Sequence, residues 1–117
     1  MEQPKFVFAH LGMNLDTPEA SMEVAEALCS FFGFSLKEGN SSNFAGPNIE
    51  VTKKRFPGVY GHIGIGTPDV AAAKAWLEEK GLQFRPETAK EKDGVLTAIY
   101  LKQEIAGFAV HLVKKEI

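Results

Sequence analysis

The sequence predicts an α+β fold in which one unit, a strand, a helix and three further strands, occurs twice. Apolar residues follow the same order of strand-like and helix-like spacing in both halves of the chain. A Thr-Pro pair, a stretch with helical spacing and then a glycine also occur in both halves, at 17–33 and at 67–81. A repeat of about fifty-five residues therefore indicates two βαβββ modules, each with one helix across a small sheet.

The first half begins with a strand over 6–15, followed by a helix that opens at Thr17-Pro18. A hydroxyl suits the N-cap of a helix, and proline suits its first position. Gly33 suits a left-handed C-cap, so the helix should end there, with its apolar stripe and Phe31 and Phe32 in the core. Short extended segments should follow at 34–37, 42–44 and 48–53, separated by turns at 38–40 and 45–47.

The second half repeats this order. A strand over 60–66 leads to a helix opened by Thr67-Pro68 and closed by Gly81, and Trp76 should lie in the core. A strand over 82–85, a longer loop, and strands over 95–102 and 107–114 complete the half. Because the seam at 56–58 is short, we expect a single domain over 1–117, with module one at about 5–55 and module two at about 59–115.

Composition narrows the classes of partner. With 117 residues, 44% hydrophobic content and a net charge of -2, the chain has no broad basic field for nucleic acid or an anionic membrane. No apolar run approaches the roughly 20 residues that cross a bilayer, so we expect a cytoplasmic protein. The single Cys29 fits a reducing compartment and is better explained as a small buried hydrophobe than as a reactive thiol.

All three histidines fall on equivalent strand positions. In the first strand of each half, a histidine shares its face with glycines, while bulky apolar residues take the opposite face. In the last strand of each half, one polar residue likewise faces away from its bulky neighbours. The residues are His10, Glu50, His62 and His111.

Three imidazoles and one carboxylate are typical ligands of a divalent transition metal, namely zinc, nickel, cobalt, manganese or iron. A lone strand histidine is more often a hydrogen-bonded structural group, but three in matching phase with a glutamate favour a metal site. Weaker candidates for substrate binding are Lys53 and Arg55, which could receive a carboxylate or phosphate, although a short basic run is more often a solvated turn. Asn14 and Tyr100 could line the cavity.

Two stretches carry a resemblance to a known family. Residues 10–18, HLGMNLDTP, with FFGF at 31–34, and residues 61–70, GHIGIGTPDV, with LEEKGL at 77–82, resemble the modules of the vicinal oxygen chelate superfamily. That superfamily includes glyoxalase I, bleomycin resistance proteins and extradiol dioxygenases, and the resemblance covers almost the whole chain. The sequence is also similar to the glyoxalase-like domain that accompanies 2-keto-3-deoxy-6-phosphogluconate aldolases in some bacteria. The resemblance implies metal ligands on the first and last strand of each module, which here are His10, Glu50, His62 and His111.

The resemblance implies a metal-dependent lyase or isomerase that acts on a small hydroxy- or oxo-acid through a metal-chelated enediolate, with Glu50 as the base. Two departures put the glyoxalase reaction in doubt. His111 stands where glyoxalase-like members usually have a glutamate, and residues 102–107 replace the family's usual turn. The alternatives are a non-catalytic small-molecule-binding or regulatory module of the same fold, and an iron(II) dioxygenase. Exposed sheet edges lead us to expect a homodimer, with ligands drawn from one chain or from both.

Overall fold

The computed structural model describes residues 2–117 as one eight-stranded sheet with two helices. Module one consists of β1 (Val7–Met13), α1 (Pro18–Phe32), β2 (Leu36–Glu38), β3 (Ser42–Ala45) and β4 (Ile49–Thr52). Module two consists of β5 (Gly61–Thr67), α2 (Val70–Glu79), β6 (Phe84–Lys92), β7 (Val95–Leu101) and β8 (Phe108–Lys114). Both modules therefore have the predicted βαβββ order, and the α+β fold class is confirmed.

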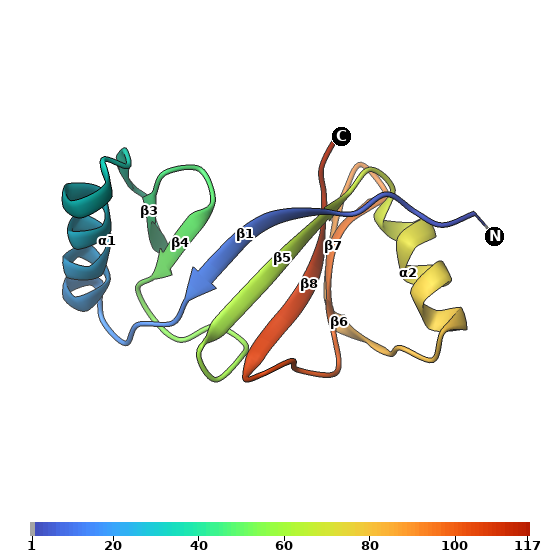
Figure 1. Cartoon of the computed structure of the whole chain (residues 1–117). Helices are drawn as coiled ribbons and strands as arrows, with labels where there is room; N and C mark the ends of the chain where they lie inside the picture. The colour runs from blue at the N-terminus through green and yellow to red at the C-terminus, as the bar shows by residue number, and fades with distance from the viewer. Residues whose placement is uncertain (1) are drawn as a thin grey trace.

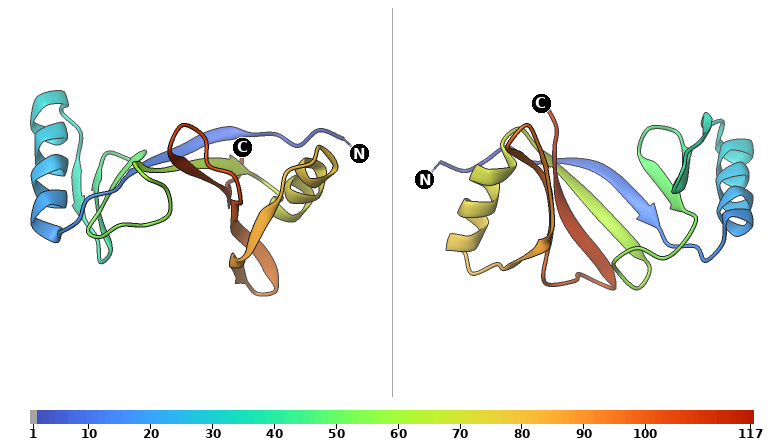
Figure 2. Two further views of the ribbon diagram at one scale, coloured as in Figure 1. Left: turned by 90° about the horizontal axis from the view of Figure 1, so that it is seen from below. Right: turned by 180° about the vertical axis from the view of Figure 1, so that it is seen from behind.

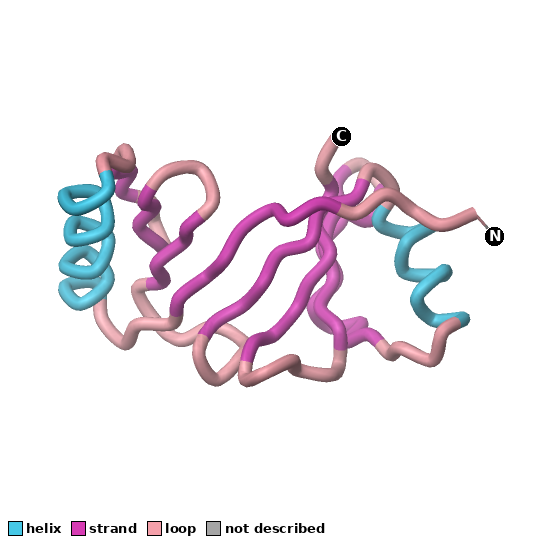
Figure 3. The backbone as a smooth tube through the Cα atoms, viewed as in Figure 1, coloured by secondary structure: helices cyan, strands magenta, loops and turns pink. Residues whose placement is uncertain are grey.

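The two modules join edge to edge in a single sheet of order β2-β3-β4-β1-β5-β8-β7-β6 (Figure 1). In each module the first and last strands pair in parallel, β1 with β4 and β5 with β8, and β1 pairs with β5 in antiparallel fashion. The strands run continuously between a helix at either end of the molecule (Figure 3). The sheet is strongly curved, and the β6–β7 hairpin turns out of the plane of β1 and β5 (Figure 2).

Local capping explains the helix boundaries. Thr17 accepts a hydrogen bond from the Ala20 amide at 3.1 Å, and Gly33 ends α1 with a left-handed φ of 75°, as predicted. The start of α2 differs from the prediction, because the helix begins at Val70 rather than at Thr67-Pro68. Asp69 is the N-cap of α2, and the Thr67 carbonyl accepts the Lys115 amide at 2.9 Å, which keeps Thr67 in the β5–β8 ladder.

The predicted loop after residue 85 is wrong, because β6 continues to Lys92. Its pairing with β7 shifts register between Arg85 and Lys90 and again between Lys90 and Glu91. The bulge hides the regular alternation by which a strand is recognised in a sequence.

The apolar core lies in module two, where α2 packs on β7 and β8. Its buried centre is Val70, Ala73, Ile99 and Leu112. Phe31 and Phe32, predicted to be core residues, are 77% and 66% exposed, because they lie in the last turn of α1, whereas the buried residues of that helix, Ser21 and Ala25, lie nearer its start. Trp76 is half-buried against Phe6. Among residues 2–117, none of the helices is long and apolar enough to cross a membrane.

Candidate metal centre

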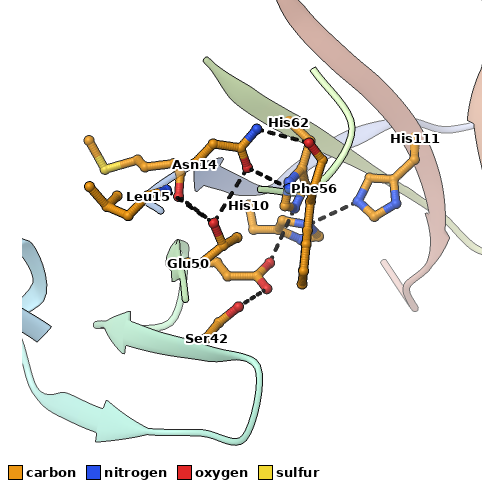
Figure 4. Close-up of polar contacts among 10 residues, drawn as sticks. His10, Asn14, Leu15, Ser42, Glu50, Phe56, His62 and His111 are labelled. Carbon is orange, nitrogen blue, oxygen red and sulfur yellow. Dashed lines mark hydrogen bonds and ion pairs between the residues drawn. The ribbon is translucent and has the colours of Figure 1, made fainter. Parts of the chain in front are cut away.

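The predicted ligands lie in two adjacent cross-strand rows on one face of the sheet. One row runs through Phe44, Glu50, Gly12, His62 and Ala109. The other runs through His10, Gly64, His111, Tyr100 and Arg85. Paired residues in a sheet point to the same side, so the ladder brings the four predicted ligands together from β1, β4, β5 and β8 (Figure 4).

Two glycines make room for the imidazole rings. Gly12 lies between Glu50 and His62 in its row, and a Cβ added to Gly12 would lie 2.0 Å from Cε1 of His62. Gly64 lies between His10 and His111, and a Cβ added there would lie 2.4 Å from Cε1 of His10. Each module therefore supplies a glycine over which the first histidine of the other module lies.

Short polar contacts link the four side chains. Nε2 of His62 lies 3.2 Å from Oε1 of Glu50, and Nε2 of His111 lies 3.0 Å from Nε2 of His10. The Ser42 hydroxyl donates to Oε2 of Glu50 at 2.7 Å, which fixes the second carboxylate oxygen. The histidines offer three potential ligand atoms that all lie within 4.8 Å of one another.

The spacing of these atoms is close to that of a metal site. Two ligands of one tetrahedral ion, each about 2.0–2.2 Å from it, lie roughly 3.3–3.6 Å apart. The His10–His111 and His62–Glu50 contacts, at 3.0 and 3.2 Å, are slightly shorter, so the side chains would have to move apart by a few tenths of an ångström to hold an ion. Within the described chain, Nε2 of His62 faces Glu50, while Nδ1 of the same ring is buried without a hydrogen-bond partner. The donor set of three imidazoles and a carboxylate suits a borderline divalent ion.

The electrostatics of the cluster favour the neutral forms of His10 and His111 beside an ionised Glu50. Burial lowers the pKa of His111 to about 3 and also lowers the pKa of His10; in both cases the neighbouring His62 acts in the same direction. The hydrogen bond with His62 lowers the pKa of Glu50 to about 2, and the hydrogen bond from Ser42 adds to this effect. Neutral histidines and an ionised glutamate are the protonation states that bind metals.

Cavities open on two sides of the cluster. One, of about 120 Å³, is lined by residues of module two together with Glu50 and Phe56: Glu50, Phe56, His62, Thr88, Lys90, Ala98, Tyr100 and His111. The other, of about 210 Å³, lies on the module-one side and is lined by His10, Phe44, Pro47, Asn48, Ile49 and Glu50. Glu50 borders both cavities, so a ligand in either cavity can reach the cluster.

Asn14, predicted to line the substrate cavity, organises a loop in the structure, and its contact with substrate stays a prediction. Its Nδ2 donates to the carbonyls of Phe56 and Gly58, both at 3.0 Å, and its Oδ1 accepts the Phe56 amide at 3.3 Å. These bonds hold the Phe56 ring in a stacked arrangement 6.5 Å from the His62 ring (Figure 4). The amide of Asn14 has both donor hydrogens in use, so the structure gives no support for substrate contact by this residue.

Lys53 and Arg55 are also engaged with protein groups. Lys53 Nζ donates to the Gly39 carbonyl at 2.7 Å. Arg55 donates to the Val59 carbonyl at 2.9 Å and forms an exposed ion pair with Asp16 at 3.0 Å. Both residues lie outside the linings of the two cavities, so their role in substrate binding stays a prediction without support from the geometry.

Tyr100 lines the smaller cavity, as predicted for a residue near the substrate, and its ring stacks on His111 with 4.5 Å between centroids. Burial raises the pKa of Tyr100 to about 12, so its hydroxyl stays protonated at neutral pH. Sequence reasoning missed Thr88 and Lys90 in this cavity because residues 86–92 were assigned to a loop. It also missed Ser42, because the register that places Ser42 near Glu50 is not visible in the sequence.

The sequence matches no protein-family model and no curated protein sequence. Similar solved structures do exist. The hypothetical protein BH1468 from Bacillus halodurans C-125 has a TM-score of 0.68 and 17% identity, over 97% of this chain and 96% of that one. A variant of Streptomyces coelicolor methylmalonyl-CoA epimerase in complex with 2-nitronate-propionyl-CoA has a TM-score of 0.64 and 19% identity, over 93% and 94%.

Methylmalonyl-CoA epimerase from Mycobacterium tuberculosis has a TM-score of 0.61 and 15% identity, over 94% of this chain and 88% of that one. Identities this low show likeness of fold alone. The agreement extends over nearly the full length of each chain. The chain therefore has the vicinal oxygen chelate fold.

Proposed function

We propose that the chain is a metal-dependent enzyme of the lyase or isomerase type that removes a proton beside a carbonyl group of a small hydroxy- or oxo-acid. One observation carries this proposal. Potential ligands on the first and last strand of each module converge on one face of the sheet, directly beside a cavity of about 120 Å³. A site of this kind combines a cation, a carboxylate and room for a small substrate.

We propose that His10, Glu50, His62 and His111 hold the ion. A divalent ion bound there would act as a Lewis acid toward the negative charge that develops on substrate oxygen when a proton is removed. Of the four side chains, Glu50 alone is anionic at neutral pH, so we propose it as the proton acceptor. Ser42 holds one carboxylate oxygen, which leaves the other directed toward the histidines.

The fold comparison supports an isomerase over other reactions. Three of the similar structures are named methylmalonyl-CoA epimerase, and an epimerase inverts a carbon centre. Proton removal and return beside a carbonyl accomplishes such an inversion. The cavity in this chain limits the reacting part of the substrate to a small group.

A second candidate is a small-molecule-binding or regulatory module that works without metal. The observation that favours it is that the four side chains pair among themselves, His10 with His111 and His62 with Glu50. Such pairing gives the three Nε2 atoms and Oε1 of Glu50 a polar partner when no ion is present. No comparable observation on residues 2–117 favours the iron(II) dioxygenase alternative, so we do not propose it.

Metal content decides between the two candidates. We would measure it by elemental mass spectrometry on protein purified without chelators or affinity-tag metals. We expect about one transition-metal ion per chain in the wild type, and less than a tenth of that in the His62→Ala variant, which loses a ligand. Glu50→Gln should weaken binding, and Glu104→Gln, which changes an exposed glutamate, is the matched control.

The loaded protein would then be incubated in D2O with small oxo-acids, hydroxy-acids, hemithioacetals and methylmalonyl-CoA, and solvent exchange at carbon would be followed by NMR. Exchange that depends on both the ion and Glu50 supports the enzyme. If the protein neither retains an ion nor takes one up on titration, the metal-dependent enzyme is excluded and the binding module stands.

The homodimer stays a prediction. Strands β2 and β6 are the edges of the sheet, and edge strands are where a second chain could pair. All four proposed ligands belong to one chain, so the ligand set does not need a partner to be complete.

A further inference from the structure

The irregular pairing of β6 determines which charge faces the smaller cavity. Arg85 pairs with Tyr100, and Lys90 pairs with Ala98. Tyr100 and Ala98 are two positions apart on β7, whereas their partners on β6 are five positions apart. In a regular antiparallel ladder the partner of Ala98 would be Glu87, so the bulge replaces an acidic residue by a basic one at this position.

A side chain stabilises the bulge. The Thr88 hydroxyl donates to the Arg85 carbonyl at 2.6 Å and accepts the Tyr100 amide at 3.0 Å, so it takes the place of a backbone partner in the ladder. Glu87, displaced from the cavity, forms an exposed ion pair with Arg85 at 3.0 Å. Arg85 and Glu87 are thus paired with each other. Lys90 lines the cavity together with Thr88.

An acidic side chain shares this cavity with Lys90. Glu50 belongs to the same lining, and its Oε1 lies 3.2 Å from Nε2 of His62. A negatively charged ligand that enters the cavity would be repelled unless a positive charge lies nearby. Lys90 is the basic residue in the lining of this cavity, and neutral residues surround the proposed ligands in the lining of the module-one cavity.

The size of the cavity restricts the ligand. A volume of about 120 Å³ corresponds to roughly four water molecules at about 30 Å³ each. The cavity therefore accommodates a group of a few non-hydrogen atoms. The Phe56 ring forms one wall, stacked on His62, and the phenol ring of Tyr100 forms another, stacked on His111. These flat apolar walls suit a planar carboxylate or oxo-acid group.

We propose that Lys90 recognises the carboxylate of a small oxo- or hydroxy-acid, which binds in the cavity between β6, β7 and the histidine cluster. The inference that this acid reacts at the cluster rests on the proposed function, whereas the inference that Lys90 recognises its charge does not. The acid end of the substrate thereby lies on the module-two side of Glu50. Any larger uncharged part of the substrate extends toward the module-one cavity of about 210 Å³.

The test compares a carboxylate with its neutral counterpart. Pyruvate and pyruvamide have nearly the same shape and differ in charge, and their binding would be followed by isothermal titration calorimetry and protein NMR shifts. Protein as purified and protein loaded with zinc would both be used. We expect Lys90→Gln to weaken pyruvate binding about tenfold or more, because a charged hydrogen bond is lost, and to change pyruvamide binding less than about twofold.

Two further variants separate charge from structure. Lys90→Arg retains the charge and should keep pyruvate binding within a few-fold of the wild type. Lys92→Gln removes the same charge two residues along β6, outside the cavity lining, and should leave both ligands unaffected. The inference would be overturned if Lys90→Gln weakened the binding of pyruvate and pyruvamide equally, or if Lys92→Gln weakened pyruvate binding as much as Lys90→Gln does. It would also be overturned if no form of the protein bound pyruvate.

Metal content of the same samples distinguishes this inference from the proposed function. Pyruvate binding that depends on Lys90 in a protein that binds no metal would uphold the carboxylate site and exclude the metal-dependent enzyme. A stoichiometric ion together with pyruvate binding that is indifferent to Lys90 would leave the enzyme standing and exclude the carboxylate site.

Discussion

The two modules contribute to the site in the same way but are held together differently. Each supplies proposed ligands from its first and last strand, and each supplies a glycine over which the other module's histidine lies. Module two packs an apolar cluster under α2, built on Val70, Ala73 and Leu112. In module one, by contrast, polar side chains fill much of the space between α1 and the sheet.

Hydrogen bonds among Ser21, Asn43 and the Val51 carbonyl link α1 to the sheet in module one. The Ser21 hydroxyl, on α1, donates to the Val51 carbonyl at 2.7 Å and accepts a hydrogen bond from Asn43 at 3.0 Å. The three residues are completely buried. The comparison shows that the strand ladder, rather than the composition of the interior, determines where the ligands lie.

The largest expected effect is on the module-two core. Leu112→Ala should lower the free energy of unfolding by about 2–5 kcal/mol, because the side chain is buried and its loss leaves a cavity. Ser21→Ala in module one should cost about 1–3 kcal/mol, because Asn43 and the Val51 carbonyl lose a buried partner. Urea unfolding of both variants measures the two changes in free energy of unfolding. A larger loss from Ser21→Ala than from Leu112→Ala would mean that the polar packing of module one contributes more to stability than the apolar core of module two.

The second-largest expected effect is at Gly12 and Gly64, the glycines that make room for the imidazole rings. Gly12→Ala and Gly64→Ala should each lower metal affinity about 100-fold and cost about 1–3 kcal/mol of stability, although neither removes a ligand. The added methyl groups would overlap the His62 and His10 rings and force them to move. Metal titration followed by a competing chelator measures the affinity.

Gly66→Ala is the control for these two variants. Gly66 lies on β5 two residues beyond Gly64, and a Cβ there would meet the Lys115 and Val7 side chains instead of an imidazole. We expect it to affect stability while metal affinity stays within a few-fold of the wild type. Unchanged metal affinity in both Gly12→Ala and Gly64→Ala would show that the rings do not need these glycines.

Alternation along the strands was sufficient to predict the fold and to single out the residues of the cluster. His10 and His62 share a face with glycines in sequence, and the paired strands place them on one face in space. Capping chemistry likewise predicted both ends of α1, through Thr17 and Gly33. These features are local, so a single sequence contains them.

Features that depend on pairing between strands were not predictable. The register shift that brings Lys90 opposite Ala98 lies in a segment with a proline and alternating charges, which favours a loop on propensity alone. The hydrogen bonds that engage Asn14, Lys53 and Arg55 depend on loops folding back onto the strands. Phe31 has helical spacing typical of a core position, but α1 is buried through Ser21 and Ala25, and its last turn is exposed.

The smallest expected effect is at the exposed end of α1. Phe31→Ala should change the free energy of unfolding by less than about 0.5 kcal/mol, because a ring that is 77% exposed buries little area and alanine is the better helix former. Leu77→Ala on α2, which packs against the module-two core, is the matched variant and should cost about 2 kcal/mol or more. Thermal unfolding at several protein concentrations measures both. Phe31→Ala could instead lower the free energy of unfolding as much as Leu77→Ala does, with a Tm that rises with protein concentration in the wild type but not in Phe31→Ala. That result would mean that a second copy of the chain covers this end of module one. The contrast between the modules would then apply to the isolated chain only.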